Sequence, residues 1–369
     1  MMSRRKFITT AVLGSAGAAV AGYALNARNA RAQYDALVQR TWRHTQGDVG
    51  THPEQMLELA RYATLAPSSH NTQCWKFRIG EGLVAILPDL QRRCPVVDPD
   101  DHHLFVSLGC AAENLIQAAA ANGFRGVATF NVGGDESVNI TLDPATPIVS
   151  PLFEAIPFRQ STRGEFDGKP ISSEDLKLLE EAGAGNGVRV HLLTERKAME
   201  QVLEFVIQGN TAQMRDRAFV QELKDWVRFN GAHAARTGDG LFSGSSGNPS
   251  VPVWLGKRMF DLFFAEDAEN DKYARHVRSS AGVAVFVSER DDKSSWIEIG
   301  RAFERFALQA TVLGIRHAHL NQPVEVLSLR PEFAKYIGIK SGRPDLVIRF
   351  GRGSEMPRSL RRPIETVVL

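Results

Sequence analysis

The residues best suited to chemistry lie in one polar stretch of ten residues, from Ala66 to Trp75. It combines two serine hydroxyls with the side-chain amides of Asn71 and Gln73. An amide both donates and accepts hydrogen bonds, so this pair suits a planar heterocycle with mixed acceptors and N–H groups, such as the pyrimidine edge of a flavin. A polar loop that only ends a helix is the alternative, because no spacing in this stretch is diagnostic by itself.

This stretch must connect a helix to a strand. Apolar residues at Leu57, Ala60 and Ala63 predict a helix, and Pro67 cannot continue it. The alternation over residues 75–79 predicts a strand directly afterwards. Serine and asparagine between them favour turns. The hydroxyls and amides are therefore expected on a loop between two regular elements.

The same loop resembles a motif of the nitroreductase-like flavoproteins, Pro-Ser-Ser-x-Asn-x-Gln-Pro-Trp. Here the string reads Pro67-Ser68-Ser69-His70-Asn71-Thr72-Gln73-Cys74-Trp75, with Cys74 in place of the second proline. In that family the loop contacts the flavin ring of FMN. The resemblance therefore implies that the ring contacts of an FMN cofactor come from Pro67, Ser68, Ser69, Asn71 and Gln73.

A second string, Arg159-Gln160-Ser161-Thr162-Arg163, offers two guanidinium groups and a hydroxyl. Alternate residues of an extended segment share a side, so Arg159, Ser161 and Arg163 are expected to converge. Such a set suits a phosphate dianion, although a solvated loop is the alternative. Arg-x-Ser-x-Arg also resembles the phosphate-binding opening of a nitroreductase subunit. Family members are normally dimers in which one subunit contacts the FMN phosphate and the other contacts the ring.

The second half of the chain repeats parts of the first. The segment 108–113 can be laid on 299–304, which places Gly109 on Gly300, a shift of 191. The helix predicted around Leu57 matches a later segment at a shift of 119, which places Leu57 on Leu176. Because the two shifts differ by 191 − 119 = 72, the second half holds an insertion of 72 residues. The order of these matches predicts an α+β fold of two fused pseudo-symmetric halves. It resembles the nitroreductase fold of the Acg-like branch, where two fused halves replace a dimer.

The predicted boundaries are 48–150 for the first half and 151–369 for the second, with the insertion over about 205–277. No Arg-x-Ser-x-Arg precedes the first half, so one FMN site between the halves is expected. The insertion contains aromatic residues and a Gly-, Ser- and Pro-rich stretch over 238–252. It is expected to form a lid over the flavin, or else an extra helical layer. The resemblance also implies that Arg361 or Arg362 lies near the phosphate.

The N-terminus carries Ser3-Arg4-Arg5-Lys6-Phe7, an uncharged stretch over 8–25 and Ala30-Arg31-Ala32. This pattern predicts a twin-arginine signal peptide over residues 1–32 and export to the periplasm. An uncleaved membrane anchor is an alternative, because about 18 uncharged residues is near the minimum for a span. A fortuitous arginine pair before a loose helix is the other.

Other features exclude several classes of function. A net charge of +2 without a long basic run argues against a nucleic-acid partner. The cluster from Asp98 to His103 is better explained by a solvated helix start than by a metal site. The three cysteines, at 74, 94 and 110, have no metal or Cys-x-x-Cys spacing. A disulfide between Cys74 and Cys94 is left open.

Together these features predict an exported FMN-dependent oxidoreductase that resembles the nitroreductases. FMN would pass a hydride or electrons to a small planar acceptor of the nitroaromatic or quinone type, and no dedicated acid or base residue is evident. Free NAD(P)H is not expected outside the cytoplasm, so the donor is unknown and another protein or a quinol is considered. A monomer is expected. The alternatives are a protein that only sequesters FMN, and an interaction module whose flavin site has decayed.

Overall fold

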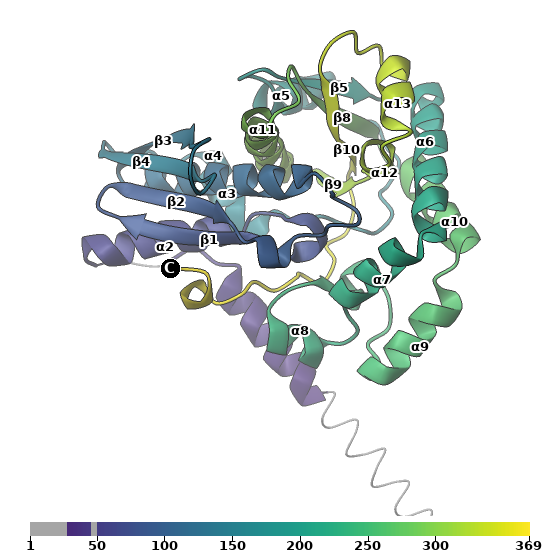
Figure 1. The fold of residues 1–369 in the computed structure, drawn as a ribbon, viewed down its shortest axis with the longest axis horizontal. Helices are drawn as coiled ribbons and strands as arrows, with labels where there is room; N and C mark the ends of the chain where they lie inside the picture. Colours follow the sequence, from purple (N-terminus) through teal and green to yellow (C-terminus); the bar gives the residue numbers. More distant parts are fainter. Residues whose placement is uncertain (1–27, 46–49) are drawn as a thin grey trace, which may run out of the picture.

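The structure is a computed structural model that describes residues 28–45 and 50–369. Two long helices, α3 (His102–Ala121) and α11 (Lys293–Val312), form its centre and pack on each other. Each helix covers one four-stranded antiparallel sheet, α3 in the first half and α11 in the second (Figure 1). The fold is therefore organised around one helix pair.

The first half begins with α2 (His52–Thr64) and continues into a sheet of strand order β1-β2-β4-β3. The strands are β1 (Trp75–Gly80), β2 (Leu83–Pro88), β3 (Phe124–Phe130) and β4 (Val138–Pro144). The expected hairpin joins β1 to β2, with Trp75 opposite Pro88. Gly82 takes a φ of +66° in its turn, a conformation that favours glycine. Trp75 and Phe77 are fully buried beneath the sheet.

The second half repeats this arrangement strand for strand. Its sheet has the order β5-β8-β10-β9. In chain order β5, β8, β9 and β10 correspond to β1, β2, β3 and β4, so the two sheets have the same strand order. The strands are β5 (Val188–Leu193), β8 (Gly282–Ser288), β9 (Arg316–His319) and β10 (Arg343–Gly351). α5 (Ser173–Gly183) corresponds to α2, and α11 to α3. The predicted α+β class and the two pseudo-symmetric halves are confirmed.

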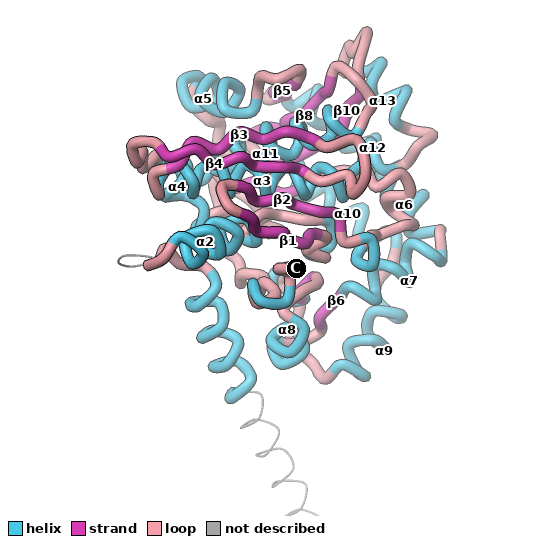
Figure 2. Tube along the Cα trace, turned by 60° about the vertical axis from the view of Figure 1, so that its left-hand side comes forward, coloured by secondary structure: helices cyan, strands magenta, loops and turns pink. Residues whose placement is uncertain are grey.

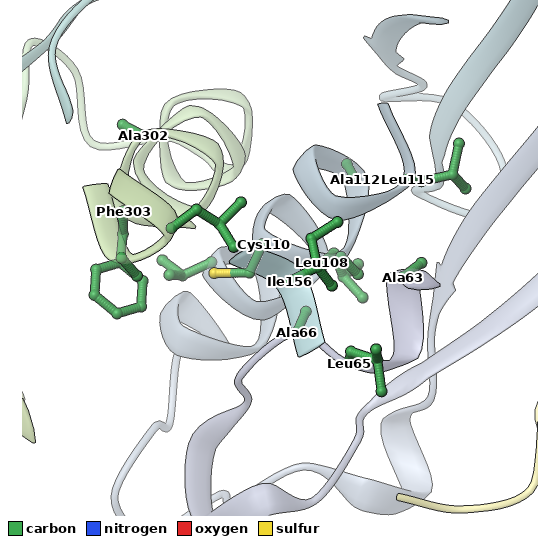
Figure 3. Close-up of a cluster of buried hydrophobic side chains, with 14 of the residues drawn as sticks. Ala63, Leu65, Ala66, Leu108, Cys110, Ala112, Leu115, Ile156, Ala302 and Phe303 are labelled. Atoms are coloured by element: carbon green, nitrogen blue, oxygen red, sulfur yellow. The ribbon is translucent and has the colours of Figure 1, made fainter. Parts of the chain in front are cut away.

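The two halves share one apolar core. Figure 3 shows Leu108 and Cys110 of α3 beside Ala302 and Phe303 of α11, with Ile156 from the connection between the halves. All of them are buried, as are Ile299, Phe306 and Ala310 on the predicted apolar face of α11. α3 is long and apolar enough to cross a membrane by composition, but most of it is buried inside the protein. It is a core helix.

The insertion lies between β5 and β8, strands that pair directly although residues 194–281 separate them. It contains α6 (Arg196–Arg215), α7 (Arg217–Trp226), α8 (Gly231–Thr237), α9 (Val253–Phe263) and α10 (Glu266–Arg278), together with short strands β6 (Val227–Arg228) and β7 (Leu241–Phe242). It is wider than the 205–277 expected from the sequence, because α6 and the end of α10 also belong to it. Figures 1 and 2 show these helices along one side of the two halves.

Both ends of the described chain return to the first half or the insertion. Residues 28–41 form a helix whose Tyr34 ring packs on Phe242 of β7. The C-terminal residues pair with β1, Phe77 N–H donating to Val367 and Leu369 N–H donating to Phe77. The twin-arginine string and the apolar stretch of the expected signal peptide lie outside the described residues. Its expected cleavage site, Ala30–Ala32, lies within the 28–41 helix.

Smaller elements complete the chain. α4 (Pro151–Ala155) lies in the connection between the halves. α12 (Gln322–Glu325) and α13 (Arg330–Tyr336) separate β9 from β10. Cys74, Cys94 and Cys110 are all buried and unbonded to one another, so the open possibility of a Cys74–Cys94 disulfide is not realised.

Candidate functional site

The loop between α2 and β1 has an unusual backbone. His70, Asn71 and Gln73 adopt φ values of 47°, 54° and 54°, although none is glycine. Left-handed backbone at such residues costs on the order of 1 kcal/mol each and persists only where the surroundings enforce it. Ser68 Oγ accepts a hydrogen bond from the Gln73 N–H at 2.9 Å and tightens the turn. The remaining constraints come from distant parts of the chain.

The side-chain amide of Asn71 is hydrogen-bonded within the protein. Its Nδ2 donates to the Gly240 carbonyl at 3.0 Å and to the Leu360 carbonyl at 3.2 Å. Its Oδ1 accepts from Arg361 at 2.9 Å, and the side chain is buried. Three bonds use both donor hydrogens and one acceptor lone pair. The expected contact between the Asn71 amide and a flavin edge is not supported by this placement.

Gln73 is used in the same way. It is fully buried, its Nε2 donates to the Gly238 carbonyl at 2.9 Å, and its Oε1 accepts from the Arg362 backbone N–H at 2.7 Å. The two amides therefore fasten the insertion and the C-terminal segment to the loop. The sequence does not reveal this, because the partners lie between 165 and 290 positions further along the chain.

Arg361 and Arg362 line neither of the two cavities described below and are engaged elsewhere. Arg361 donates to the carbonyls of Thr64, Leu65 and Ala66, the C-terminal end of α2, at 2.7, 3.1 and 2.9 Å. Burial lowers the pKa of Arg361 to about 9, and neighbouring Arg159 adds to this shift. Arg362 donates through Nη2 to the Thr366 carbonyl at 3.2 Å. Arg361 therefore stabilises the junction of α2 with the C-terminal segment, whereas Arg362 bonds within that segment.

Two adjoining cavities lie where the first half, the second half and the insertion meet. The larger cavity has a volume of about 250 Å³ and the smaller about 120 Å³. They share the side chains of Arg163, Tyr273 and His319. Each cavity also has lining residues of its own. Those of the larger cavity include Pro67, Ser68, Ser69, His70, His103, Ser107, Cys110, Gln213, Phe219, Leu223, Leu241, Phe264, Phe303, Asn321, Gln322 and Glu325. Those of the smaller cavity include Ser161, Ser246, Lys272, His276 and Arg349.

Arg163 is the exceptional cation of this region. No hydrogen bond or ion pair joins its guanidinium to any residue that the structure describes, yet it lies in the wall of both cavities. Burial lowers its pKa, an effect that Tyr273 partly offsets. The side chain is partly exposed, so the guanidinium presents its donors to the cavities. The arrangement is suited to an anion that approaches Arg163 through a cavity.

Further positive charge surrounds the smaller cavity. Arg349 is 1% exposed, donates to the carbonyls of Thr162 and Gly164 at 3.2 and 2.7 Å, and has no carboxylate partner among the described residues. Burial lowers the pKa of Arg349 to about 10, which leaves it charged at neutral pH. Lys272, which pairs with Glu269, and the Ser161 side chain also line this cavity. This set provides charge and donors for a phosphate group.

Arg159 does not join them, which corrects the expectation that Arg159, Ser161 and Arg163 converge. Its Nε lies 3.2 Å from Glu304 Oε1 in a buried ion pair, and its Nη2 donates to the Leu65 carbonyl at 2.9 Å. The segment is held against the edge of the second sheet. The Thr162 N–H donates to the His317 carbonyl, and Ser161 forms a β-bridge with His317. Arg159 consequently points into the interface of the halves.

A hydrogen-bonded chain that includes His103 and Asn321 forms another part of the wall of the larger cavity. Asp98 accepts the backbone N–H groups of His103 and Leu104 at 3.0 Å each, at the start of α3. His103 Nδ1 lies 3.5 Å from Asp98, and its Nε2 faces Asn321 Nδ2 at 3.2 Å. Val347 N–H donates to Asn321 Oδ1, which directs the Asn321 amide N–H₂ toward His103 and the larger cavity. One Asn321 hydrogen stays available to a ligand.

The acidic and histidine cluster at the start of α3 is largely hydrogen-bonded within the protein, although His102 Nδ1 has no partner among the described residues. Ligand atoms of Asp98, His102 and His103 lie within 4.8 Å of one another. However, both Asp98 oxygens accept backbone N–H groups, and His102 Nε2 is bonded to Asp345 at 2.9 Å. The cluster lies at the start of α3 as expected, but Asp98, His102 and His103 are buried, which corrects the expectation that this helix start is solvated.

Two buried polar atoms in the larger cavity lack partners among the described residues, Gln322 Oε1 and His319 Nδ1. Burial lowers the pKa of His319 to about 3, so the ring is neutral at physiological pH. Unsatisfied buried groups of this kind indicate a site for a polar ligand. Sequence reasoning missed His103, His319, Tyr273, Lys272 and Arg349.

The positions on α11 that correspond to the cavity-lining positions of α3 carry different side chains. The shift of 191 places Glu298 at the position of Ser107 and Arg301 at that of Cys110. Arg301 pairs with Glu298 at 2.8 Å and with Glu113 at 3.3 Å. Small cavity-lining side chains on α3 are thus replaced by a network of long charged ones on α11. The two faces of the helix pair are not equivalent.

The chain has curated relatives that match it over most of its length. No family model matches the chain. It is 24% identical over 326 residues to a Mycobacterium tuberculosis protein named "Putative NAD(P)H nitroreductase Rv3131", covering 85% of this chain and 91% of that protein. It is 23% identical over 323 residues to the "Putative NAD(P)H nitroreductase acg" of the same species, covering 83% and 92%.

Solved structures with detectable likeness cover little more than half of the chain. The FMN-dependent nitroreductase NfnB of Mycobacterium smegmatis, in complex with NADPH, is 13% identical with a TM-score of 0.39, covering 58% of this chain and 96% of its own. A nitroreductase with bound FMN from Bacteroides fragilis is 16% identical with a TM-score of 0.34, covering 55% and 88%.

Proposed function

We propose that this chain is an FMN-dependent oxidoreductase that binds one FMN between its two halves and passes electrons to a small planar acceptor. The observation that carries the proposal is the unpartnered guanidinium of Arg163 between two adjoining cavities. One cavity is small and cationic, and the other is larger and mixed in polarity. Such a pair suits a ligand with an anionic end and a planar, hydrogen-bonding end.

The residues present fit FMN. The smaller cavity would hold the phosphate, with Ser161, Arg163, Lys272 and Arg349 as its partners. The larger cavity would hold the flavin ring beside the backbone and hydroxyls of Ser68 and Ser69. Ligand sites usually span about 300–1,000 Å³, so neither cavity alone is large enough, whereas the joined pair is. The relatives' names, which include NAD(P)H nitroreductase, support the same assignment.

Bound FMN would supply hydride and single-electron transfer, and the protein would position and tune it. Arg163 and Arg349 would neutralise the phosphate. Asn321 and Gln322 offer an amide N–H and an unsatisfied carbonyl oxygen to the polar edges of the ring. Phe219, Leu223 and Tyr273 from the insertion close the larger cavity with apolar surface. The insertion would thereby act as a lid that limits water access and acceptor size.

A single site is proposed because the corresponding face of the helix pair is filled by the Arg301 network. We further propose that the chain is a monomer, its two halves replacing a dimer, and that it is exported by the twin-arginine route. That route carries folded proteins and suits a cofactor inserted before export. Since free NAD(P)H is not expected outside the cytoplasm, the electron donor is proposed to be another protein or a quinol.

The test is the visible spectrum of the purified full chain, followed by stopped-flow reduction. Bound flavin would give an absorbance maximum at roughly 450 nm, and release of FMN on denaturation would identify it. Reduction by NAD(P)H or a quinol analogue, followed by reoxidation with a quinone or nitroaromatic, is the expected result. Reduction by dithionite alone would favour the competing function, sequestration of FMN without turnover. A colourless protein that does not bind added FMN would refute both.

A further inference from the structure

α9 carries unusually exposed apolar side chains. Trp254, Leu262 and Phe263 are 70%, 74% and 69% exposed. The inner face is packed: Gly256 lies against the Phe229 ring, and Phe260 stacks on Phe264 at 4.4 Å. The exposed residues are therefore not a consequence of a poorly packed helix. α9 is fixed to the insertion by one face and leaves the other without a partner among the described residues.

This outer face combines apolar and basic side chains. Trp254, Arg258 and Leu262 recur every four residues, which places them on one side of the helix, and exposed Lys257 lies beside them. Tryptophan, leucine and phenylalanine with flanking lysine and arginine are typical of helices that lie in the plane of a membrane interface. Basic side chains reach the headgroups while their stems cover apolar surface.

α9 lies at the same end of the molecule as the start of the described chain. The helix over residues 28–41 packs on the insertion through Tyr34, whose ring lies 4.6 Å from that of Phe242. Asn230, which begins α8 beside this helix, donates to the Val251 carbonyl at 2.8 Å, in the segment that enters α9. Figures 1 and 2 both show α9 and the start of the described chain at one end of the molecule.

Several unpaired basic side chains lie at this end, beside the acidic start of α10. Exposed Arg28, Arg236, Lys257 and Arg258 have no carboxylate partner among the residues described. Asp261 of α9 is paired with Lys224, and Arg31 with Asp35. Negative charge at the start of α10 is partly neutralised, since Glu266 pairs with Arg215, while Asp267 stays exposed. Each basic residue near an anionic bilayer contributes about 1 kcal/mol to attraction.

We propose that α9 docks on an anionic lipid bilayer, with Trp254 and Leu262 entering the interface. Phe264 ends α9 and also lines the larger cavity, so docking would bring that cavity close to the bilayer. The proposal is independent of FMN, because it concerns only the outer surface of the insertion.

The experiment measures whether Trp254 enters the bilayer. The full chain is mixed with vesicles of phosphatidylcholine and phosphatidylglycerol that contain brominated lipid, which quenches nearby tryptophan emission. The wild type is compared with W254F, with the double variant L262S/F263S, and with I148S/V149S as a matched control. Ile148 and Val149 are also exposed, at 65% and 59%, but lie between β4 and α4. Substitution of exposed residues is not expected to disturb folding.

Lipid quenching of tryptophan emission is expected in the wild type and in I148S/V149S. The same quenching should be absent in W254F and at least threefold weaker in L262S/F263S. Reversal of charge in K257E/R258E should weaken vesicle partition about tenfold at low salt, since attraction scales with the number of basic residues. Equal quenching in the wild type and W254F would overturn the proposal, even if the chain binds vesicles through another segment. A dimer in light scattering without lipid, lost in L262S/F263S, would also overturn it.

Discussion

Gly109 of α3 and Gly300 of α11 face each other where the two helices cross: a Cβ at Gly109 would lie 3.1 Å from the Gly300 Cα and 2.0 Å from the Ile297 carbonyl oxygen. A Cβ at Gly300 would reciprocally lie 1.9 Å from the Val106 carbonyl oxygen. Only glycine permits this approach. The pair explains why the two glycines are the positions at which the two halves of the sequence align.

Alanine at either glycine should therefore destabilise the fold. The obstructing atoms are backbone, which cannot move away as a flexible side chain can, so G109A and G300A are expected to lose about 3 kcal/mol of unfolding free energy or more. Urea denaturation measures the loss. G133A is the control, because a Cβ at Gly133 meets only the far end of Asn131 at 3.9 Å. Wild-type stability in G300A would show that the crossing is looser than described.

Substitution of Asn71 separates a structural role from a flavin contact. N71A removes bonds to Gly240, Leu360 and Arg361, so it should lower the unfolding free energy of the cofactor-free protein by about 1–3 kcal/mol. Thermal unfolding of flavin-free protein is the measurement. N248A serves as the control, since Asn248 is exposed. An N71A protein of normal stability that binds FMN weakly would instead restore the flavin-contact interpretation.

Removal of the Arg163 charge should weaken FMN far more than it weakens the fold. A charge-assisted hydrogen bond to phosphate is worth about 1.5–3 kcal/mol, which corresponds to roughly 10- to 150-fold in dissociation constant. Because Arg163 has no partner among the described residues, R163Q should unfold at nearly the wild-type temperature. Flavin fluorescence titration measures the binding. R78Q is the control, since Arg78 pairs with Asp135 on the surface. Unaltered binding in R163Q would contradict the phosphate assignment.

Buried histidines should make the protein sensitive to acid. Burial lowers the pKa of His319 to about 3 and that of His70 to about 4, whereas the usual value is 6.5. A pKa lowered in the folded state gives stability that is present above pH 6.5 and is lost as the pH falls toward the folded value. H319N should reduce the difference in unfolding free energy between pH 7 and pH 4.5 by up to about 2 kcal/mol.

The control for this prediction is H52N, because His52 is exposed on α2. Urea midpoints at the two pH values supply the comparison. An unchanged pH dependence in H319N would mean that His319 is protonated in the folded protein or solvated through the cavity.

The lid role of the insertion is tested by a deletion that spares its anchoring carbonyls. Gly238 and Gly240 hold Gln73 and Asn71, so residues 248–250, which are exposed, are the appropriate segment to remove. The deletion should speed dithionite reduction of bound flavin several-fold, since the nearby Ser246 lines the smaller cavity. Stopped-flow absorbance is the measurement. Identical rates in the deletion variant and the wild type would remove the lid interpretation.

The sequence by itself determined the α+β class, the two repeated halves and the loop that carries Ser68 and Ser69, because periodicity, glycine spacing and proline act locally. It could not determine the fate of each polar side chain. Arg159 and Arg163 are equivalent in the motif, yet one lies beside Glu304 and the other has no partner that the structure describes. Likewise, Asn71 and Gln73 meet carbonyls far along the chain. Tertiary structure decided these roles, since hydrogen-bond partners and burial arise only when distant segments pack together.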